Sequence, residues 1–212
     1  GLRTSKTRVR RLMKSHGLCP SQKRRVRLRT TQSNPHLPVA PHLLLEAPPA
    51  TRPGERFYSD ITYIPTHEGW LFTAATLDGY SRKCAGWSAA DNMESPLVLR
   101  AAQRALAPVA AAEGATTIHH SDRGIQYASP RFRALLAQLG IRASMSRRAN
   151  CWDNAPMENF FGHLKEEYLR QFHKPTFQEA QLMIDEYIHF YNYQRIQLKT
   201  KQTPYQLRCL SL

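Results

Sequence analysis

Three carboxylates stand where the neighbouring residue types favour a chemical role. Asp60 interrupts a segment rich in aromatic and β-branched residues, where a carboxylate costs free energy unless it is paired or bound to a cation. Asp122 closes a short β-branched segment and precedes Arg-Gly, at the kind of strand end where ligands gather in open α/β sheets. Glu158 falls in the first turn of a predicted helix, whose dipole favours a carboxylate. Taken singly, each position fits an ordinary surface, turn or helix-start acid about as well.

The joint placement of the three carboxylates on strand, strand end and helix points to a metal site. Acidic groups brought close together raise one another's pKa unless cations bind between them. Hard oxygen ligands with open positions suit Mg²⁺ or Mn²⁺. Two such ions can activate a water or a 3′-hydroxyl and also stabilise the leaving oxygen of an in-line phosphoryl displacement. The residues alone therefore predict a metal-dependent phosphodiester enzyme that holds two ions.

The strands and helices that must position these carboxylates follow from the hydrophobic pattern. Three segments with short links predict an antiparallel meander, with Gly69 and Asp78-Gly79 at the turns. Ser95-Pro96 predicts the start of a helix, and Ser129-Pro130 predicts another. The expected strands are 57–64, 70–77, 83–89, 116–120 and 141–144.

Two further helices complete the predicted body. A long helix that carries Glu158 is expected to begin between Asp153 and Pro156, and the next begins with a capping box at Thr176 and Glu179. The order β-β-β-α-β-α-β-α-α predicts an α/β fold with a mixed five-stranded sheet flanked by helices.

Positive charge is concentrated at the N-terminus. Residues 1–45 carry eleven Lys and Arg and no Asp or Glu, whereas the rest of the chain carries nineteen against sixteen. Such an arm suits a polyanionic partner, although basic segments are also often merely solvated. Residues 5–16 predict a short basic helix that ends at Gly17, and six prolines between Asn34 and Pro53 predict an extended linker. We expect a basic helical arm at 1–33, a Pro-rich linker at 34–54 and the catalytic body at 55–212.

Cysteine usage and hydropathy argue against several other protein classes. Four scattered cysteines show no Cys-x-x-Cys or Cys/His ligand spacing, so neither a disulfide framework nor a zinc site is expected. No stretch approaches the roughly 20 apolar residues that cross a bilayer, and no apolar signal region follows the basic N-terminus. The expectation is a cytoplasmic protein with no membrane partner.

Four motifs stand in order around the carboxylates. They begin Asp60-Ile-Thr-Tyr-Ile, His120-Ser-Asp-Arg-Gly, Ser144-Met-Ser-Arg-Arg and Glu158-Asn-Phe-Phe-Gly. These motifs resemble the catalytic chain of DDE-type bacterial insertion-sequence transposases related to retroviral integrases. Thirty-five residues separate Asp122 from Glu158, which matches the triad spacing of that family. The resemblance runs from about Glu55 to the C-terminus, and residues 8–14 resemble the tail of the family's accessory helical region.

The resemblance implies a ribonuclease H-like fold and a transposase. Its expected chemistry is metal-dependent DNA strand cleavage, which exposes a 3′-hydroxyl, followed by direct attack of that hydroxyl on target phosphate without a covalent enzyme intermediate. The expected partners are double-stranded transposon ends and target DNA, further copies of the chain assembled on DNA, and an upstream-frame partner that carries a helix-turn-helix and a coiled coil.

The resemblance also implies DNA contacts. Lys165 lies seven residues after Glu158 and returns to nearly the same helix face, where the family often has a basic residue that contacts the transposon end. Asn154 is expected to cap the helix, with a DNA contact as the alternative. Arg123 flanks Asp122 and is a candidate for positioning phosphate. The other expected DNA contacts are Arg147 and Arg148 before the helix, and Arg10, Arg11, Lys23, Arg24 and Arg25 in the arm.

Four residues beside Asp122 are open to two interpretations. Gln126 and Tyr127 either position DNA or, for Tyr127 in particular, belong to the core. His119 and His120 end a buried strand, where a satisfied structural histidine is more common than a metal ligand.

Three residues near the other motifs also remain open. Trp152 either stacks on a base or anchors a packed loop. Arg195 either binds phosphate or pairs with a core acid. Gln197 stands where the family often has His and is assigned no catalytic role.

Two alternatives to a transposase use the same residues differently. A DNA-binding regulator would keep the basic arm and the fold without catalysis, which the complete set of carboxylates argues against. A stand-alone nuclease of the same fold would cleave DNA without joining it.

Overall fold

The molecule is built on a mixed five-stranded sheet. The computed structural model describes residues 4–18, 37–113, 117–148 and 150–210. The sheet order is β3-β2-β1-β4-β5: the first three strands form an antiparallel meander, and β4 and β5 run parallel to β1. The strands are β1 (Arg56–Thr66), β2 (Gly69–Asp78), β3 (Cys84–Ala90), β4 (Ile118–Ser121) and β5 (Arg142–Met145). The predicted fold class and the position of every predicted strand are therefore confirmed.

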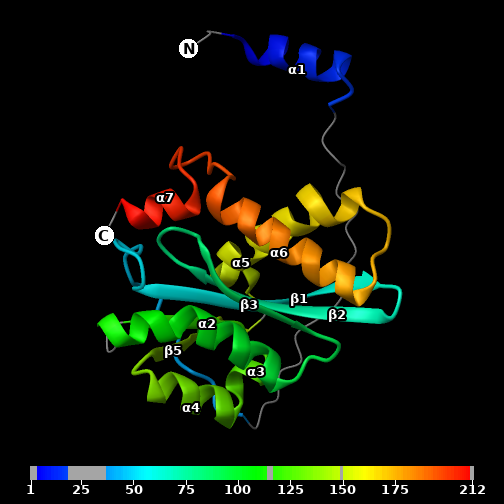
Figure 1. Ribbon diagram of the computed structural model, residues 1–212. Helices are drawn as coiled ribbons and strands as arrows, with labels where there is room; N and C mark the ends of the chain where they lie inside the picture. The colour runs from blue at the N-terminus through cyan, green and yellow to red at the C-terminus, as the bar shows by residue number, and fades with distance from the viewer. Residues whose placement is uncertain (1–3, 19–36, 114–116, 149, 211–212) are drawn as a thin grey trace.

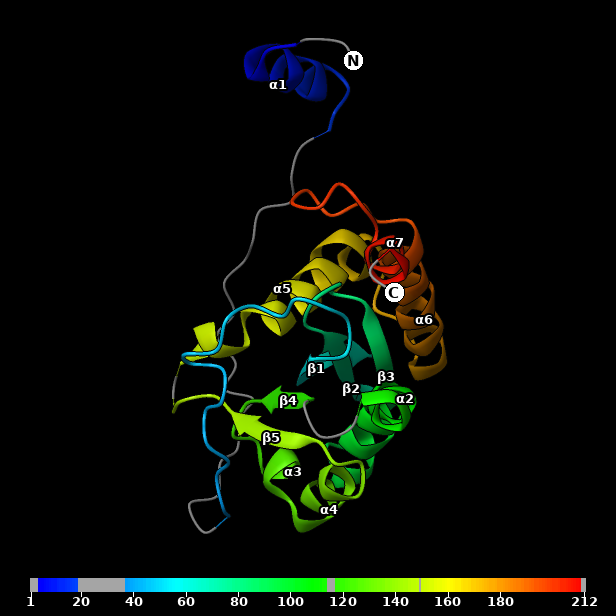
Figure 2. The same ribbon diagram turned by 90° about the vertical axis from the view of Figure 1, so that its left-hand side faces the viewer.

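Helices cover both faces of the sheet. Figures 1 and 2 show α5 and α6 on one side, and α2, α3 and α4 on the other. The bounds are α2 (Ser95–Glu113), α3 (Ile125–Ala128), α4 (Pro130–Gln138), α5 (Ala155–His163) and α6 (Phe177–Tyr193). Because both faces are covered, β2 is buried almost without interruption from Thr73 to Asp78 and does not show simple alternation.

Two hydrophobic clusters fill the two layers. Phe57 and Ala74 pack with α2 and α4 in the first cluster. Ile64 and Leu71 pack with α5 and α6 in the second. Alternation along β1 places Asp60 on the face of Ile64, which is the face that α5 covers. The strand thus directs Asp60 toward the layer that carries Glu158.

Predicted helix starts agree with the structure in detail. The Ser129 hydroxyl accepts a hydrogen bond from the Phe132 amide at 3.3 Å at the start of α4. Thr176 and Glu179 form the expected capping box at the start of α6. The basic helix α1 (Lys6–Ser15) ends before Gly17, which has a φ of 67°. No residue of α1 is buried, and Figure 1 shows this helix apart from the sheet and its helices.

The long helix expected to begin between Asp153 and Pro156 is confirmed: α5 begins at Ala155, and helical turns continue from it to Gln171. A 3₁₀ turn (Cys151–Asn154) precedes α5, and a π-helical turn (Leu164–Tyr168) with a further 3₁₀ turn (Leu169–Gln171) follows it. The four-residue helix α3 and the C-terminal helix α7 (Pro204–Cys209) were not predicted. No described helix is both long and apolar enough to cross a membrane.

The described part of the predicted Pro-rich linker, residues 37–54, contains bends and turns, and it packs on the body. The Leu43 amide donates to the Ser144 hydroxyl at 2.9 Å, and the Met145 amide donates to the Pro41 carbonyl at 3.4 Å. Leu37 and Ala40 contact the first hydrophobic cluster. Residues 37–43 therefore pack against the body beside β5.

Candidate active site

Asp60 and Asp122 lie next to each other at the edge between β1 and β4. The two strands are parallel with Ser59 opposite Ser121, so the following residue on each chain segment is a carboxylate. The Ile61 amide donates to Asp60 Oδ1 at 2.8 Å, and the Gly124 amide donates to Asp122 Oδ1 at 2.9 Å. A Cβ at position 124 would approach Asp122 Oδ1 to 3.0 Å, so glycine lets the backbone close around this carboxylate.

Glu158 lies exposed in the first turn of α5. Asn154 holds the start of this helix against β1, because its side-chain amide donates to the Ser59 carbonyl at 3.1 Å. The side chain of Asn154 makes no helix-capping hydrogen bond, so the predicted capping role is wrong. Asn154 is also buried, which leaves its side chain closed to DNA in this geometry. It instead fixes α5 beside the strand that carries Asp60.

The three carboxylates share one electrostatic environment. Burial, and then the negative charges of Asp122 and Glu158, raise the pKa of Asp60 to about 8, although the Ile61 amide and the Lys165 charge act to lower it. Within the described residues, no three His, Cys, Asp or Glu side chains are already arranged around a single metal position. The fold thus brings the predicted triad together as interacting charges and not as a finished ligand shell.

Lys165 completes this group of charges. It is half-buried at the start of the π-helical turn, and its Nζ lies 4.7 Å from the centre of the Tyr63 ring. Burial lowers the pKa of Lys165, whereas the Asp60 charge raises it. Lys165 therefore lies within the field of Asp60, while its return to the helix face of Glu158 stays a prediction.

A partly buried ion pair holds the π-helical turn that carries Lys165. The Arg195 guanidinium donates to both oxygens of Glu167, at 2.7 Å from Nε and 2.6 Å from Nη2. The Tyr187 hydroxyl donates to the same carboxylate at 3.2 Å, and His163 Nδ1 lies 2.9 Å from it. Of the two expectations for Arg195, pairing with an acid is confirmed, although Glu167 is only partly buried and not a core residue. Glu167 had no signal in the sequence that distinguished it from its neighbour Glu166.

Replacing Arg195 by Leu is expected to destabilise the protein by about 2 kcal/mol, because the two-pronged hydrogen bond is lost and Glu167 stays partly buried. Urea unfolding measures the change. Arg170→Leu is the matched control, since Arg170 pairs with Glu166 one helical turn away on the surface and such pairs contribute about 0.5 kcal/mol or less. Equal effects of the two substitutions would show that the Arg195 pair does not hold the turn.

The basic residues predicted to contact DNA have different surroundings. Arg147 is half exposed. Its backbone amide, Nε and Nη2 donate hydrogen bonds to the Asp153 carboxylate at 2.8, 3.1 and 2.8 Å. Arg148 is exposed, and Arg123 Nε donates to the Ser146 carbonyl at 2.8 Å. Arg10 and Arg11 are exposed on α1, whereas Lys23, Arg24 and Arg25 lie outside the described residues.

The histidines beside Asp122 are structural, as predicted. His119 Nε2 lies 2.8 Å from the Ser59 hydroxyl, and burial lowers its pKa to about 3. His120 Nδ1 lies 2.9 Å from the Ser144 hydroxyl, and its pKa is lowered to about 4 by burial and then by the His42 charge. Both rings therefore stay neutral near pH 7 and tie β4 to its neighbouring strands.

The remaining open assignments are resolved by burial. Tyr127 is a core residue at 3 % exposure, and the Gln126 amide donates to the Met93 carbonyl at 2.8 Å. Trp152 is 81 % exposed, so its interpretation as a packed anchor is wrong. The Gln197 amide donates to the Ser81 carbonyl at 3.0 Å and therefore has a structural role.

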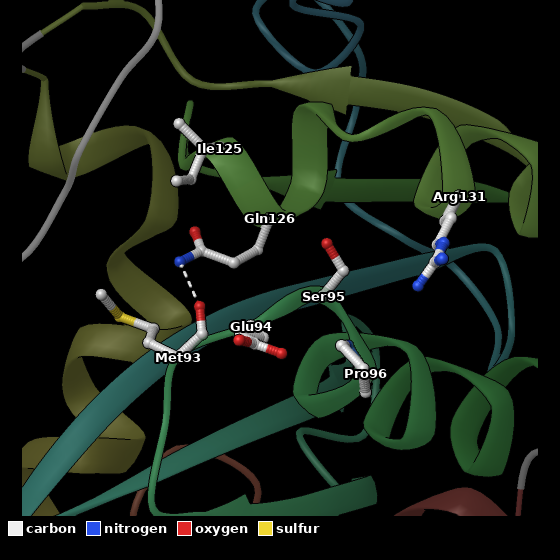
Figure 3. Close-up of a pocket in the computed structure, with 7 residues that line it drawn as sticks. All are labelled: Met93, Glu94, Ser95, Pro96, Ile125, Gln126 and Arg131. Carbon is white, nitrogen blue, oxygen red and sulfur yellow. Dashed lines mark hydrogen bonds between the residues drawn. The ribbon is translucent and has the colours of Figure 1, made fainter.

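An open pocket of about 330 Å³ lies between the start of α2 and α3, the short helix that follows Asp122 in the chain. Figure 3 shows its lining, in which the Gln126 side chain reaches the Met93 carbonyl below α3. The lining residues are Met93, Glu94, Ser95, Pro96, Ile125, Gln126 and Arg131. None of the three carboxylates lines this pocket, so it is a feature separate from them.

Comparisons with known proteins agree with this architecture. Residues 50–151 match one family model described as an integrase core domain, and residues 158–212 match a second with the same description. The fold resembles a chain of the simian T-cell lymphotropic virus intasome, with a TM-score of 0.64 and 17 % identity over 83 % of this chain and 60 % of that one. It also resembles the magnesium-bound HTLV-2 integrase catalytic core domain, with a TM-score of 0.59 and 14 % identity over 75 % of this chain and 99 % of that one. These likenesses identify the ribonuclease H-like fold of integrase cores.

Similar sequences come from bacterial insertion elements. A 31 kDa protein of IS600 from Shigella sonnei is 41 % identical over 92 % of this chain and 71 % of its own length. The transposase of IS904 from Lactococcus lactis is 36 % identical over 92 % of this chain and 77 % of its own. The transposase InsF of IS3A from Escherichia coli is 39 % identical over 65 % of this chain and 47 % of its own. The chain therefore belongs to the insertion-sequence transposases with an integrase core domain, a family of polynucleotidyl transferases.

Proposed function

We propose that Asp60, Asp122 and Glu158 form the catalytic metal centre with which this transposase cleaves DNA and joins the resulting 3′-hydroxyl to target DNA. The observation that carries the proposal is the parallel register of β1 and β4, which sets Asp60 beside Asp122, and the charges of Asp122 and Glu158 both raise the pKa of Asp60. Three acids from β1, the end of β4 and α5 act on one another although they are distant in sequence. Repulsion among three carboxylates destabilises a folded protein, whereas a cation bound between them turns the repulsion into attraction.

The donor chemistry fits Mg²⁺ or Mn²⁺, and we propose two ions. All three donors are carboxylates, which are hard oxygen ligands, and both histidines nearby are already hydrogen-bonded to serine hydroxyls. The HTLV-2 integrase core of the same fold was solved in complex with magnesium. When bound, such ions lower the pKa of a nucleophilic water or hydroxyl and offset charge on the leaving oxygen.

Each residue of the proposed site contributes a distinct part of this function. Asp60 and Asp122 are held by the backbone amides of Ile61 and Gly124, so the two strands present these carboxylates in fixed directions. Glu158 enters from α5, whose start Asn154 fixes to β1. Lys165 supplies positive charge beside Asp60, and there it also contacts phosphate of the transposon end.

The DNA interface extends beyond the centre. Arg148 and the exposed half of Arg147 offer charge in the loop before Glu158, and Arg123 offers charge beside Asp122. The arm at 1–33, with Arg10, Arg11, Lys23, Arg24 and Arg25, adds contacts to phosphate that weaken with salt. The linker at 34–54 joins this arm to the catalytic body at 55–212.

The assembly that acts on DNA includes further components. We propose that the chain works as a homo-oligomer on double-stranded transposon ends and target DNA. An upstream-frame partner with a helix-turn-helix and a coiled coil supplies end recognition. The retroviral relative of the same fold was solved as part of an intasome, which supports an assembly of several copies.

The function is tested by supplying precut transposon-end duplexes with a free 3′-hydroxyl, together with plasmid target DNA and Mg²⁺ or Mn²⁺. The expected result is metal-dependent insertion of the labelled end into the plasmid. Ends that carry a 3′-dideoxy nucleotide are the matched control and should give no joined product. Plasmid nicking without joining would instead support the stand-alone nuclease, and DNA binding with neither reaction would support the regulator.

A further inference from the structure

His42 lies in the linker segment that packs beside β5, and the backbone on both sides of it is fixed. The Met145 amide donates to the Pro41 carbonyl at 3.4 Å, and the Leu43 amide donates to the Ser144 hydroxyl at 2.9 Å. These two contacts hold both neighbours of His42 against the same strand. The imidazole is therefore kept at the body, where its side chain is 13 % exposed.

The proton of the His42 ring is placed by the contacts of the two ring nitrogens. The Leu44 amide donates to Nδ1 at 3.2 Å, and a ring nitrogen that accepts carries no proton, so the ring proton sits on Nε2. Nε2 lies 3.2 Å from Asp153 Oδ2, but it is not aligned for a hydrogen bond with any acceptor among the described residues. A small rotation of the ring therefore brings this N–H into line with the Asp153 carboxylate.

Asp153 joins the linker to the helix that carries Glu158. Its side chain is 6 % exposed, and the hydrogen bond from the Arg147 side chain holds its pKa well below the usual range, although burial acts against this. Asp153 belongs to the 3₁₀ turn that leads directly into α5, and Glu158 lies in the first turn of that helix. Figure 2 shows the linker, in blue to cyan, passing beside the chain that enters α5.

The contact between His42 and Asp153 adds something that the local ion pair does not supply. Arg147 and Asp153 lie six positions apart in one loop, so their pairing closes the loop on itself. The contact with His42 instead ties this loop to a segment that is hydrogen-bonded to β5. Together with the bond from the Asn154 amide to the Ser59 carbonyl, it holds the turn before α5 at two successive residues.

We propose that His42 is a positioning residue, whose Nε2–H donates to Asp153 and holds the turn before α5 so that Glu158 meets the other two carboxylates. The inference rests on the proposed metal centre and deepens it, because it makes a linker residue part of what aligns the third carboxylate. A displacement of about 1 Å at a catalytic group can lower a rate about 100-fold, so a loosened turn should be measurable in the reaction.

His42→Leu tests this role in the joining of precut transposon-end duplexes. Its kcat is expected to be about tenfold lower or less than that of the unsubstituted chain, because Glu158 is no longer held in place. Its KM for the end duplex should stay close to that of the unsubstituted chain, because phosphate contacts come from Lys and Arg side chains. His42→Gln is the conservative variant: its side-chain amide can donate as Nε2 does, so it should restore most of the rate.

Hydrogen exchange tests the contact without DNA chemistry. The Arg147 amide donates to Asp153 Oδ2 at 2.8 Å, and the Trp152 amide donates to Asn150 Oδ1 at 3.1 Å. Both amides are expected to exchange faster in His42→Leu, whereas the amides of α6 should keep their rates. An equal acceleration across the whole chain would overturn the inference, because it would mean a general loss of stability.

Thr51→Val is the matched control. Thr51 lies in the same linker, and its hydroxyl donates to Glu55 Oε1 at 2.9 Å, a contact that does not involve the turn before α5. Its substitution is expected to leave kcat unchanged. Equal kcat values for His42→Leu and Thr51→Val would overturn the inference, as would an equal loss of kcat in His42→Leu and His42→Gln.

The unsubstituted chain separates this inference from the proposed function. If that chain gives no metal-dependent joining, the proposed function is overturned, and the role of His42 in joining falls with it. If that chain joins DNA and His42→Leu joins with an unchanged kcat, with or without faster exchange, the metal centre stands and the positioning role of His42 is wrong.

Discussion

Asp60→Asn, Asp122→Asn and Glu158→Gln are each expected to abolish DNA cleavage and joining. Losing one carboxylate removes several kcal/mol of charge stabilisation in the transition state, and each 1.4 kcal/mol is a factor of ten, so a loss of roughly 1,000-fold or more follows. The amides keep the size of the acids, and they replace charge without opening a cavity. Single-turnover assays of precut ends in Mg²⁺ and in Mn²⁺ measure the loss.

DNA binding and folding should survive these substitutions. Phosphate contacts come from Lys and Arg side chains, so the affinity for transposon-end duplex and its salt dependence are expected to stay close to those of the unsubstituted chain. Asp60→Asn removes a carboxylate that burial and two like charges disfavour, so the metal-free protein should unfold at the same or a higher urea concentration.

Asp185→Asn is the matched control for the three substitutions. Asp185 is an exposed acid on α6, and its conversion to an amide should leave cleavage and joining intact. Normal joining by any one of the three triad variants would remove that residue from the centre. Loss of DNA binding together with activity would instead indicate a structural role.

The sequence predicted Asp60 and Asp122 well because each carries a local signal. Asp60 breaks a β-branched segment, and Asp122 ends one before a glycine, and both patterns depend only on neighbours in the chain. Asp60 and Asp122 become neighbours only because β1 pairs in parallel with β4. In the chain these two strands are separated by β2, β3 and α2. Only the predicted topology and the resemblance to a family indicated that pairing.

The contacts that hold the site were less predictable, because they join residues far apart in sequence. Asn154 stands where a helix cap is expected, yet its amide reaches the Ser59 carbonyl, 95 positions away. Glu167 looks like any acid on a helix until Arg195 from the end of α6 pairs with it. Neither the π-helical turn nor the packing of residues 37–43 beside β5 has a local signature of the kind that predicted the capping box at Thr176.

Gly86→Ala is expected to destabilise the protein by about 3 kcal/mol or more, because added atoms in a packed core force the backbone to move. Gly86 is buried in β3 where α2 crosses the sheet. A Cβ at this position would lie 2.3 Å from the Ala101 carbonyl oxygen and 2.8 Å from the Ala105 amide nitrogen. Both atoms belong to the α2 backbone and cannot rotate away as a side chain does. The free energy of unfolding in urea measures the effect.

Gly162→Ala is the opposite case and the control. Apart from its own helix backbone and chain neighbours, no atom of the described residues lies within 4 Å of the Cβ that this change would add, and the residue lies inside α5. Alanine is preferred over glycine in a helix interior by about 0.5–1 kcal/mol, so this variant should be more stable than the unsubstituted chain. Because the two substitutions add the same methyl group, their difference measures how closely α2 packs on β3. A similar gain in stability from both would show that the helix does not press on the sheet at Gly86.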